Sequence, residues 1–256
     1  MKIAIVHISD IHFKGKMDVG FRRLEKLSNR ISFSRSPGEQ LLLVVTGDVA
    51  FSGSKSEYDV AAEFFRTLLI GLALDPAAKP APILFIPGNH DCNFREVGDL
   101  RPKLLDSIHE ELEALDVAGE TVNSLLRVQS DFFEFVKSVT GEVIPPGEQL
   151  FYTRMTPLGE SNIEFRCFNS AWLSRKNDIQ GALGLPASVL NAAKAKTDCD
   201  LVISLIHHPQ NWLNTASYQS FRTVVQENSD FLFTGHEHIQ QGQVVASFSG
   251  SQLSSL

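Results

Sequence analysis

Five short clusters of Asp, Asn and His residues could bind metal ions, and each follows an apolar run. They are Asp10-Ile11-His12, Gly47-Asp48, Gly88-Asn89-His90-Asp91, His207-His208-Pro209 and Gly235-His236-Glu237-His238. Carboxylate oxygens, amide oxygens and imidazole nitrogens, without a thiolate, suit divalent ions such as Mn, Fe, Zn, Ni or Co. The clusters therefore predict a metal centre that differs from a structural Cys-zinc site.

The number of candidate ligands points to two ions. The seven candidates are Asp10, His12, Asp48, Asn89, His207, His236 and His238. This set exceeds the needs of one ion and suffices for two ions that share a carboxylate, about 3.5 to 4 Å apart. Such a pair lowers the pKa of a bound water toward 7 and neutralises phosphate oxygens, so it favours attack of a metal-bridging hydroxide at phosphorus.

His90 could supply either a proton or a positive charge to the leaving alkoxide. It adjoins Asn89, and we expect Asp91 to orient its imidazole. The sequence contains no GxSxG motif and no Cys with a convincing His partner, which argues against a covalent mechanism.

Buried strands must position these clusters. Short apolar runs without helical periodicity predict strands at residues 3–8, 41–45, 83–86, 163–168, 201–206, 231–233 and 244–248. Helical patterns at residues 21–31 and 58–69 lie between strands, which predicts an α/β sandwich with helices outside. Because strand ends converge at one edge of such a sheet, we expect the five clusters to meet in one pocket.

Residues of about 100–140 break this alternation and predict a helical insertion. We expect one helix from Pro102 to near Asp116 and a second over Thr121 to Val139, followed by a loop at 145–147 that leads into sheet at Phe151. The Phe residues at 132, 133 and 135 could shape a lid, but helical spacing of Phe favours core packing.

The order DxH, GD, GNHD, H and GHxH resembles the calcineurin-like metallophosphoesterase family, with the match running from residue 10 to residue 238. The resemblance implies a four-layer α/β/β/α sandwich over residues 1–256. It implies that Asp10, His12, Asp48 and His238 hold one ion, and that Asp48, Asn89, His207 and His236 hold the other. Asp48 would bridge the ions, and His90, paired with Asp91, would face the substrate. Glu237 departs from the pattern, since the family often has a small residue there.

Three functions fit this resemblance. We favour a binuclear phosphodiesterase or nuclease that acts on nucleotides or nucleic acid, with manganese as the preferred ion and Fe, Zn, Ni or Co as alternatives. A phosphomonoesterase, including a protein phosphatase, is the alternative within the family. A non-catalytic binding scaffold is disfavoured because no ligand is missing and His90 is present.

The three remaining His residues are expected to be structural. His7 lies in the first strand and His109 on an insertion helix. His208 competes with His207 as a ligand; we choose His207, which directly follows the strand and matches the family position.

Composition narrows the class of protein. With 256 residues, 43% of them hydrophobic, the chain is long enough for one globular domain. A net charge of −7 excludes a protein whose whole surface binds nucleic acid. Residues 14–35 nevertheless hold seven Lys or Arg against two acidic residues. A solvated helix face is the favoured interpretation, and guidance of a polyanionic substrate is the alternative.

The sequence also bears on cellular context. Three separated Cys residues without a CxxC motif, and the lack of a signal peptide, favour a reduced, cytoplasmic protein without disulfides. The longest apolar stretch, residues 68–74, is too short to cross a membrane. Only eighteen residues follow His238. Related domains usually continue with more sheet, so we expect a domain of a longer protein, by analogy at the front of a large bacterial one. The oligomeric state stays open.

Overall fold

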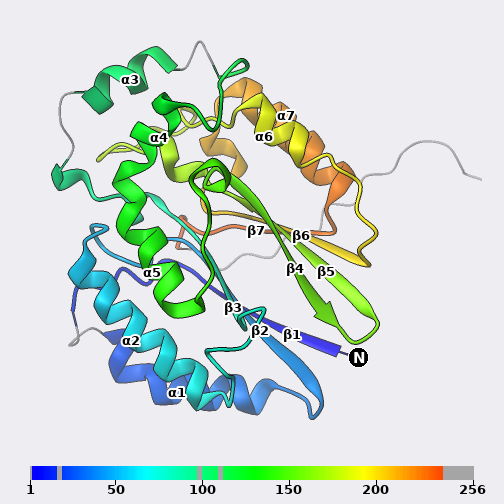
Figure 1. The fold of residues 1–256 in the computed structure, drawn as a ribbon. Coiled ribbons are helices and arrows are strands. Elements are labelled where there is room, and N and C mark those ends of the chain that lie inside the picture. The colour runs from blue at the N-terminus through cyan, green and yellow to red at the C-terminus, as the bar shows by residue number, and fades with distance from the viewer. Residues whose placement is uncertain (1, 16–18, 97–99, 109–111, 239–256) are drawn as a thin grey trace, which may run out of the picture.

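Two β-sheets pack face to face, and helices cover the outer face of each (Figure 1). The computed structural model describes residues 2–15, 19–96, 100–108 and 112–238. The layers therefore follow the order helix, sheet, sheet, helix, which confirms the predicted α/β/β/α sandwich.

The first sheet has the order β1-β2-β3, with all strands parallel: β1 (Lys2–Ile8), β2 (Glu39–Thr46) and β3 (Ile83–Ile86). Side chains alternate between its two faces, as the two-residue period of a strand requires. Leu43 and Phe85 pack against helices, whereas Val44 and Ile86 pack in the cluster between the sheets.

The second sheet has the order β4-β5-β6-β7: β4 (Phe151–Leu158), β5 (Ser161–Phe168), β6 (Leu201–Ile206) and β7 (Phe231–Phe233). β4 is antiparallel to β5, and the other pairs are parallel. Phe165 and Leu205 face the first sheet, and Phe168 and Ile206 face the outer helices.

The helices divide between the two outer layers. On the first sheet lie α1 (Val19–Ser34), α2 (Lys55–Gly71) and α5 (Ser130–Thr140). On the second lie α3 (Leu100–Ile108), α4 (Glu120–Leu126), α6 (Ala187–Ala192) and α7 (Thr215–Asn228).

Six of the predicted strands are present, and the run at 244–248 lies outside the described residues. β4 begins at Phe151, where the sheet was expected to resume. Its sequence is not an apolar run, because it is an edge strand whose buried positions include the polar residues Arg154 and Thr156, and Arg154 donates to the carbonyl of Ile83 in the first sheet.

The helices between residues 100 and 140 differ from the prediction. α3 ends at Ile108, and the chain forms a turn in which Asp116 accepts hydrogen bonds from the amides of Ala118 and Gly119, so the helix predicted to reach Asp116 is wrong. The predicted helix over 121–139 is divided by a 3₁₀ turn at Arg127–Gln129. There the Val128 carbonyl accepts from the amide of Asn93 at 2.7 Å instead of continuing the helix. His109 lies outside the described residues.

The insertion aromatics pack as expected. Phe132 and Phe135 are buried in the core under α2, and Phe133 packs against the same cluster. Core packing, rather than a lid, is therefore confirmed for these side chains.

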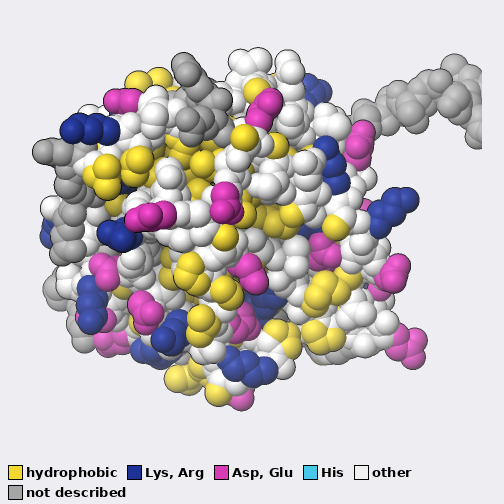
Figure 2. Space-filling view, turned by 45° about the horizontal axis from the view of Figure 1, so that its top comes forward, with side chains coloured by type: hydrophobic (Ala, Val, Ile, Leu, Met, Phe, Trp, Pro, Cys, Tyr) yellow, Lys and Arg dark blue, Asp and Glu magenta, His cyan; other side chains and the backbone are white. Residues whose placement is uncertain are grey.

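The surface carries charged side chains of both signs (Figure 2), as the composition predicts. On the face in Figure 2, basic and acidic side chains are interspersed, and hydrophobic side chains gather in its upper part. None of the helices in the described ranges combines the length and hydropathy that crossing a membrane requires.

Candidate metal centre

The five predicted clusters meet at one edge of the two sheets. Residues that follow β1, β2 and β3 come from the first sheet, and residues that follow β6 and β7 come from the second. The amide of Asp10 donates to the carbonyl of Gly47 at 3.1 Å within the first half. Nδ1 of His207 donates to the carbonyl of Thr46 at 2.7 Å and so joins the two halves. The structure thus brings all seven candidate ligands together.

Five of the candidates have a left-handed backbone. Positive φ angles occur at Asp10 (58°), His12 (54°), Asp48 (54°), His236 (73°) and His238 (53°), and Ala73 is the other described non-glycine residue with this conformation. Such angles cost about 1 to 3 kcal/mol each and cluster at functional sites. The left-handed backbone at these five residues therefore lowers the stability of the fold and directs their side chains toward one place.

Glycines allow the loops to approach closely. Gly47 has φ +90°, and a Cβ atom there would lie 2.6 Å from both the amide of Gly88 and Nδ1 of His207. Because a non-glycine residue would clash, these positions keep the backbone next to Asp48 in place.

The first group of donor atoms comes from Asp10, His12, Asp48 and His238. Nε2 of His12 lies 3.4 Å from Nε2 of His238 and 3.7 Å from Oδ2 of Asp48. Nε2 of His238 lies 3.5 Å from Oδ1 of Asp10. Donors that share an ion at about 2.1 Å lie about 3.0 to 3.4 Å apart, so these atoms fit around a cation with slight contraction.

The second group comes from Asp48, Asn89, His207 and His236. Oδ1 of Asn89 lies 3.1 Å from both Nε2 of His207 and Nδ1 of His236. Oδ1 of Asp48 lies 3.4 Å from Nε2 of His207. Asp48 therefore presents one carboxylate oxygen to each group. The ligand atoms of Asp10, His12 and His238 lie close enough together to hold an ion, and so do those of His207 and His236 together with His208.

His90 lies beside the first group, next to His12 and Asp48. Its amide donates to Oδ1 of Asp48 at 2.8 Å, and its ring lies 4.5 Å from that of His12. Nδ1 of His90 lies 2.6 Å from the carbonyl oxygen of Phe51. Because a carbonyl can only accept, Nδ1 carries a proton, and Nε2 is the atom left for a substrate.

The expectation that Asp91 orients His90 is wrong. Asp91 is fully buried, and its carboxylate accepts from the amides of Ala50 at 3.0 Å and Gly88 at 2.9 Å and from the Tyr58 hydroxyl at 3.0 Å. Burial and the nearby carboxylate of Asp48 raise the pKa of Asp91 to about 6. Asp91 thus links the loop that follows β2 to the loop that follows β3, and the Phe51 carbonyl orients the His90 imidazole.

The charges of the second group are coupled. Burial opposes ionisation of Asp48, but His207 outweighs it and holds the pKa of Asp48 well below its usual range. Burial likewise opposes protonation of His207, but Asp48 and the Thr46 carbonyl raise the pKa of His207 to about 9. Burial and the neighbouring His207 lower the pKa of His236 to about 4. Without metal, His207 is therefore a protonated partner of Asp48 at neutral pH.

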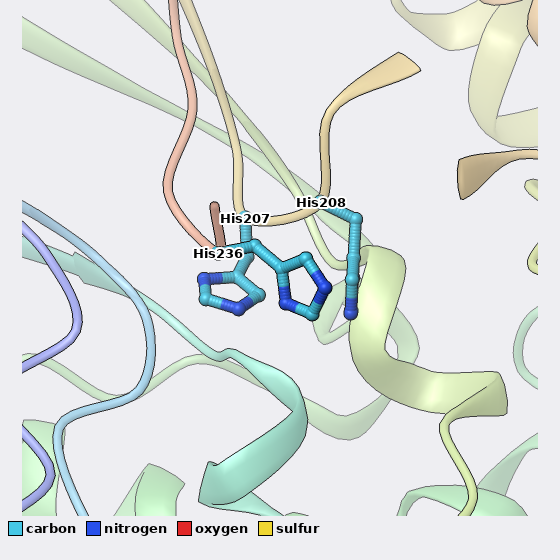
Figure 3. Close-up of side chains that lie close together, drawn as sticks. All are labelled: His207, His208 and His236. Atoms are coloured by element: carbon cyan, nitrogen blue, oxygen red, sulfur yellow. The ribbon is translucent and has the colours of Figure 1, made fainter. Parts of the chain in front are cut away.

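His208 lies beside the second group, and one of its ring nitrogens is within 4.8 Å of ring nitrogens of His207 and His236 (Figure 3). Its Nδ1 lies 2.8 Å from the Ser170 hydroxyl, whereas Nε2 of the neighbouring His207 lies 3.4 Å from Oδ1 of Asp48 and 3.1 Å from Oδ1 of Asn89. Ser170 and Phe51 were not among the predicted site residues, because neither belongs to a recognisable motif. The side chain of Glu237 is exposed and, within the described part of the chain, forms no hydrogen bond or ion pair.

Comparison with known proteins places this geometry in a family. The sequence matches the family model described as calcineurin-like phosphoesterase over residues 3–240. The chain belongs to this family. Membership implies metal-dependent hydrolysis of phosphoesters by this domain.

Two relatives show the extent of the similarity. The chain is 26% identical over 259 residues to the uncharacterized metallophosphoesterase-like protein YydB of Bacillus subtilis (strain 168), which covers 96% of the chain and 51% of YydB. It is 30% identical over 94 residues to the uncharacterized protein R555 of Acanthamoeba polyphaga mimivirus, covering 35% of the chain and 6% of R555. The chain thus spans about half the length of YydB.

Metal binding should release a proton from His207. An imidazole nitrogen must be unprotonated to bind a cation, and the raised pKa of about 9 means that the proton is present at pH 7. Between pH 7 and 8.5, the affinity of the second donor group for Mn²⁺ should therefore rise about tenfold per pH unit, with about one proton released. Calorimetry in buffers of different ionisation enthalpy measures both quantities, and a pH-independent affinity without proton release would refute this charge state.

Proposed function

We propose that this domain hydrolyses phosphodiesters of nucleotides or nucleic acid with two divalent ions held by the seven donor residues. The first ion would bind Asp10, His12, Asp48 and His238, and the second would bind Asp48, Asn89, His207 and His236. The observation that carries this proposal is the carboxylate of Asp48, whose two oxygens face different donor groups at 3.7 and 3.4 Å. Manganese is the ion we favour for this oxygen-rich and imidazole-rich set.

The chain's own residues would complete the chemistry. When bound, the ions supply positive charge for the phosphate oxygens and an acidified water for attack at phosphorus. In its doubly protonated form, His90 would give the Nε2 proton to the leaving oxygen and keep the Nδ1 proton that is donated to the Phe51 carbonyl. Asp91 would act only by holding the loops that carry Asp48 and His90.

An exposed aromatic ring beside His90, with two basic side chains near it, supports a substrate that carries a second group on its phosphate. We call Phe51, Lys14 and Arg95 the aromatic rim. Phe51 is 41% exposed, and its ring lies 5.5 Å from that of His90. Nζ of Lys14 lies 3.8 Å from the centroid of the Phe51 ring, and Arg95 hydrogen-bonds to the adjacent Ser52. An aromatic surface with cations beside it suits a nucleobase and its neighbouring phosphates.

The basic stretch on α1 adds to this rim. Arg22, Arg23, Lys26 and Arg30 are exposed, while Leu24 and Leu27 pack against the core, as expected for a solvated helix face. Because α1 connects parallel strands, its first turn lies at the edge where those strands end (Figure 1). Arg22 and Arg23 are therefore on the side from which a polyanion would approach.

Hydrolysis of bis(p-nitrophenyl) phosphate with Mn²⁺ tests the proposed function. Asp48→Ala and Asn89→Ala should each lower kcat/KM by at least about 100-fold, because each removes a metal ligand. Asp59→Ala, an exposed carboxylate on α2, is the matched control and should leave the rate unchanged.

Two comparisons discriminate between the alternative functions: the wild type against His90→Ala, and a phosphodiester against a phosphomonoester. His90→Ala should slow hydrolysis of a dinucleotide by about 100-fold or more and barely affect the p-nitrophenyl ester, whose leaving group needs no proton. Higher activity on p-nitrophenyl phosphate than on the diester would favour a phosphomonoesterase. A wild-type protein without metal-dependent hydrolysis of any ester would favour a scaffold.

The rim predicts selectivity for a nucleoside. Phe51→Ala should raise KM for thymidine 5′-phosphate p-nitrophenyl ester about fivefold or more, the loss of one base–aromatic stack, and leave KM for methyl p-nitrophenyl phosphate unchanged. Phe51→Tyr should behave as wild type. Phe33→Ala removes an 85% exposed Phe from α1 as a matched control. An equal rise in KM for both esters would contradict a stacking role.

A further inference from the structure

A buried polar network lies behind the second donor group and has no part in the chemistry above. Its centre is His208, which is 0% exposed. The neighbours of His208 are Ser170, at the start of a 3₁₀ helix after β5, and Asp178, in the loop that follows. The side chain of Asp178 is 5% exposed.

Hydrogen bonding fixes which nitrogen of His208 carries the proton. The Ser170 hydroxyl oxygen accepts from the amide of His208 at 3.2 Å and lies 2.8 Å from Nδ1 of His208. Among the described residues, Nδ1 is the only acceptor within reach of the buried Ser170 hydroxyl proton, so the hydroxyl donates to Nδ1. The proton of the neutral His208 imidazole is therefore on Nε2.

That Nε2 proton faces a carboxylate. Nε2 of His208 lies 3.8 Å from Oδ2 of Asp178, and within the described part of the chain neither atom has a hydrogen-bond partner. The other oxygen of Asp178 accepts from the amide of Arg175 at 2.6 Å, which fixes the direction of the carboxylate. At 3.8 Å the two groups do not hydrogen-bond directly, but the electrostatic attraction between the Nε2 proton and the carboxylate favours one orientation of the His208 ring.

The His208 ring in turn packs against two candidate ligands. Its centroid lies 4.8 Å from the ring of His207 and 4.7 Å from that of His236, and Figure 3 shows the three imidazoles side by side. Trp212 also packs against these rings, and its ring centroid lies 4.2 Å from that of His236. His208 makes no ring contact with His12 or His238, so its effect is directed to the second group alone.

We propose that Ser170, His208 and Asp178 form a positioning network that holds the imidazoles of His207 and His236 in the orientation that one of the two ions requires. This inference rests on the proposed function for the assignment of those ligands. The network touches neither substrate nor reacting atoms, so its three members are positioning residues. It also gives the 174–181 loop a role in the metal centre.

The loop itself is held by α3. Arg101 is buried and donates to the carbonyls of Trp172 at 3.0 Å and Ser174 at 2.9 Å, and Asp106 pairs with Arg175 at 2.6 Å. Asp106 therefore offers a control, since its side chain is 71% exposed and it contacts the same loop without contacting His208.

Binding of Mn²⁺ to the metal-free protein, measured by titration calorimetry, tests the network. The wild type should bind two ions. Asp178→Asn, which keeps the shape of the side chain, and His208→Phe, which keeps the ring, should each weaken one ion about tenfold or more and leave the other within about threefold. Asp106→Asn should bind both ions as the wild type does.

A double variant identifies which ion is affected. Asn89→Ala should leave only the first ion, and adding Asp178→Asn to it should change that remaining affinity by less than about twofold. Equal weakening of both ions in Asp178→Asn, unchanged binding of both, or further weakening in the double variant would overturn the network while leaving the two-ion proposal in place. Fewer than two ions on the wild type would overturn both proposals. If His208→Phe fails to fold, Asp178→Asn alone decides.

Discussion

The carboxylate of Asp48 is the constraint on which the rest of the structure depends. It is 1% exposed and ionised, and burying such a charge without compensation is prohibitive. The protein compensates by directing His207 at one oxygen and His12 at the other. The same arrangement suits two cations, whose charge would replace that of protonated His207. An electrostatic requirement of one buried residue thus explains why donor atoms gather around it from both sheets.

The sandwich exists, in functional terms, to hold two halves of this centre at a fixed spacing. Asp48 follows a strand of the first sheet, and His207 follows a strand of the second. Leu42, Val44 and residues like them fill the space between the sheets, and close packing there fixes their separation. The bond from His207 to the Thr46 carbonyl then sets the ring. Movement of one sheet against the other would open the second donor group.

Much of this architecture follows from the sequence, and the remainder has a physical reason for being hidden. Apolar runs predict seven strands, of which six lie in the described residues and are present, and their order predicts that the five clusters share one edge. The hydrogen-bond partners of buried polar groups, in contrast, do not follow from the sequence. Asp91 adjoins His90 in the sequence, yet the 3₁₀ turn at Asn89–Asp91 directs its carboxylate to backbone amides. Likewise, the left-handed backbone of His236 and the pairing of His208 with Asp178 arise from tertiary contacts between segments distant in sequence.

The central claim is that Asp48 bridges two ions, and anomalous diffraction from crystals grown with Mn²⁺ measures this directly. The account predicts two anomalous peaks about 3.5 to 4 Å apart, one beside each oxygen of Asp48, with His12 and His238 at one peak and Asn89, His207 and His236 at the other. A single peak, or two peaks of which only one contacts Asp48, would contradict it.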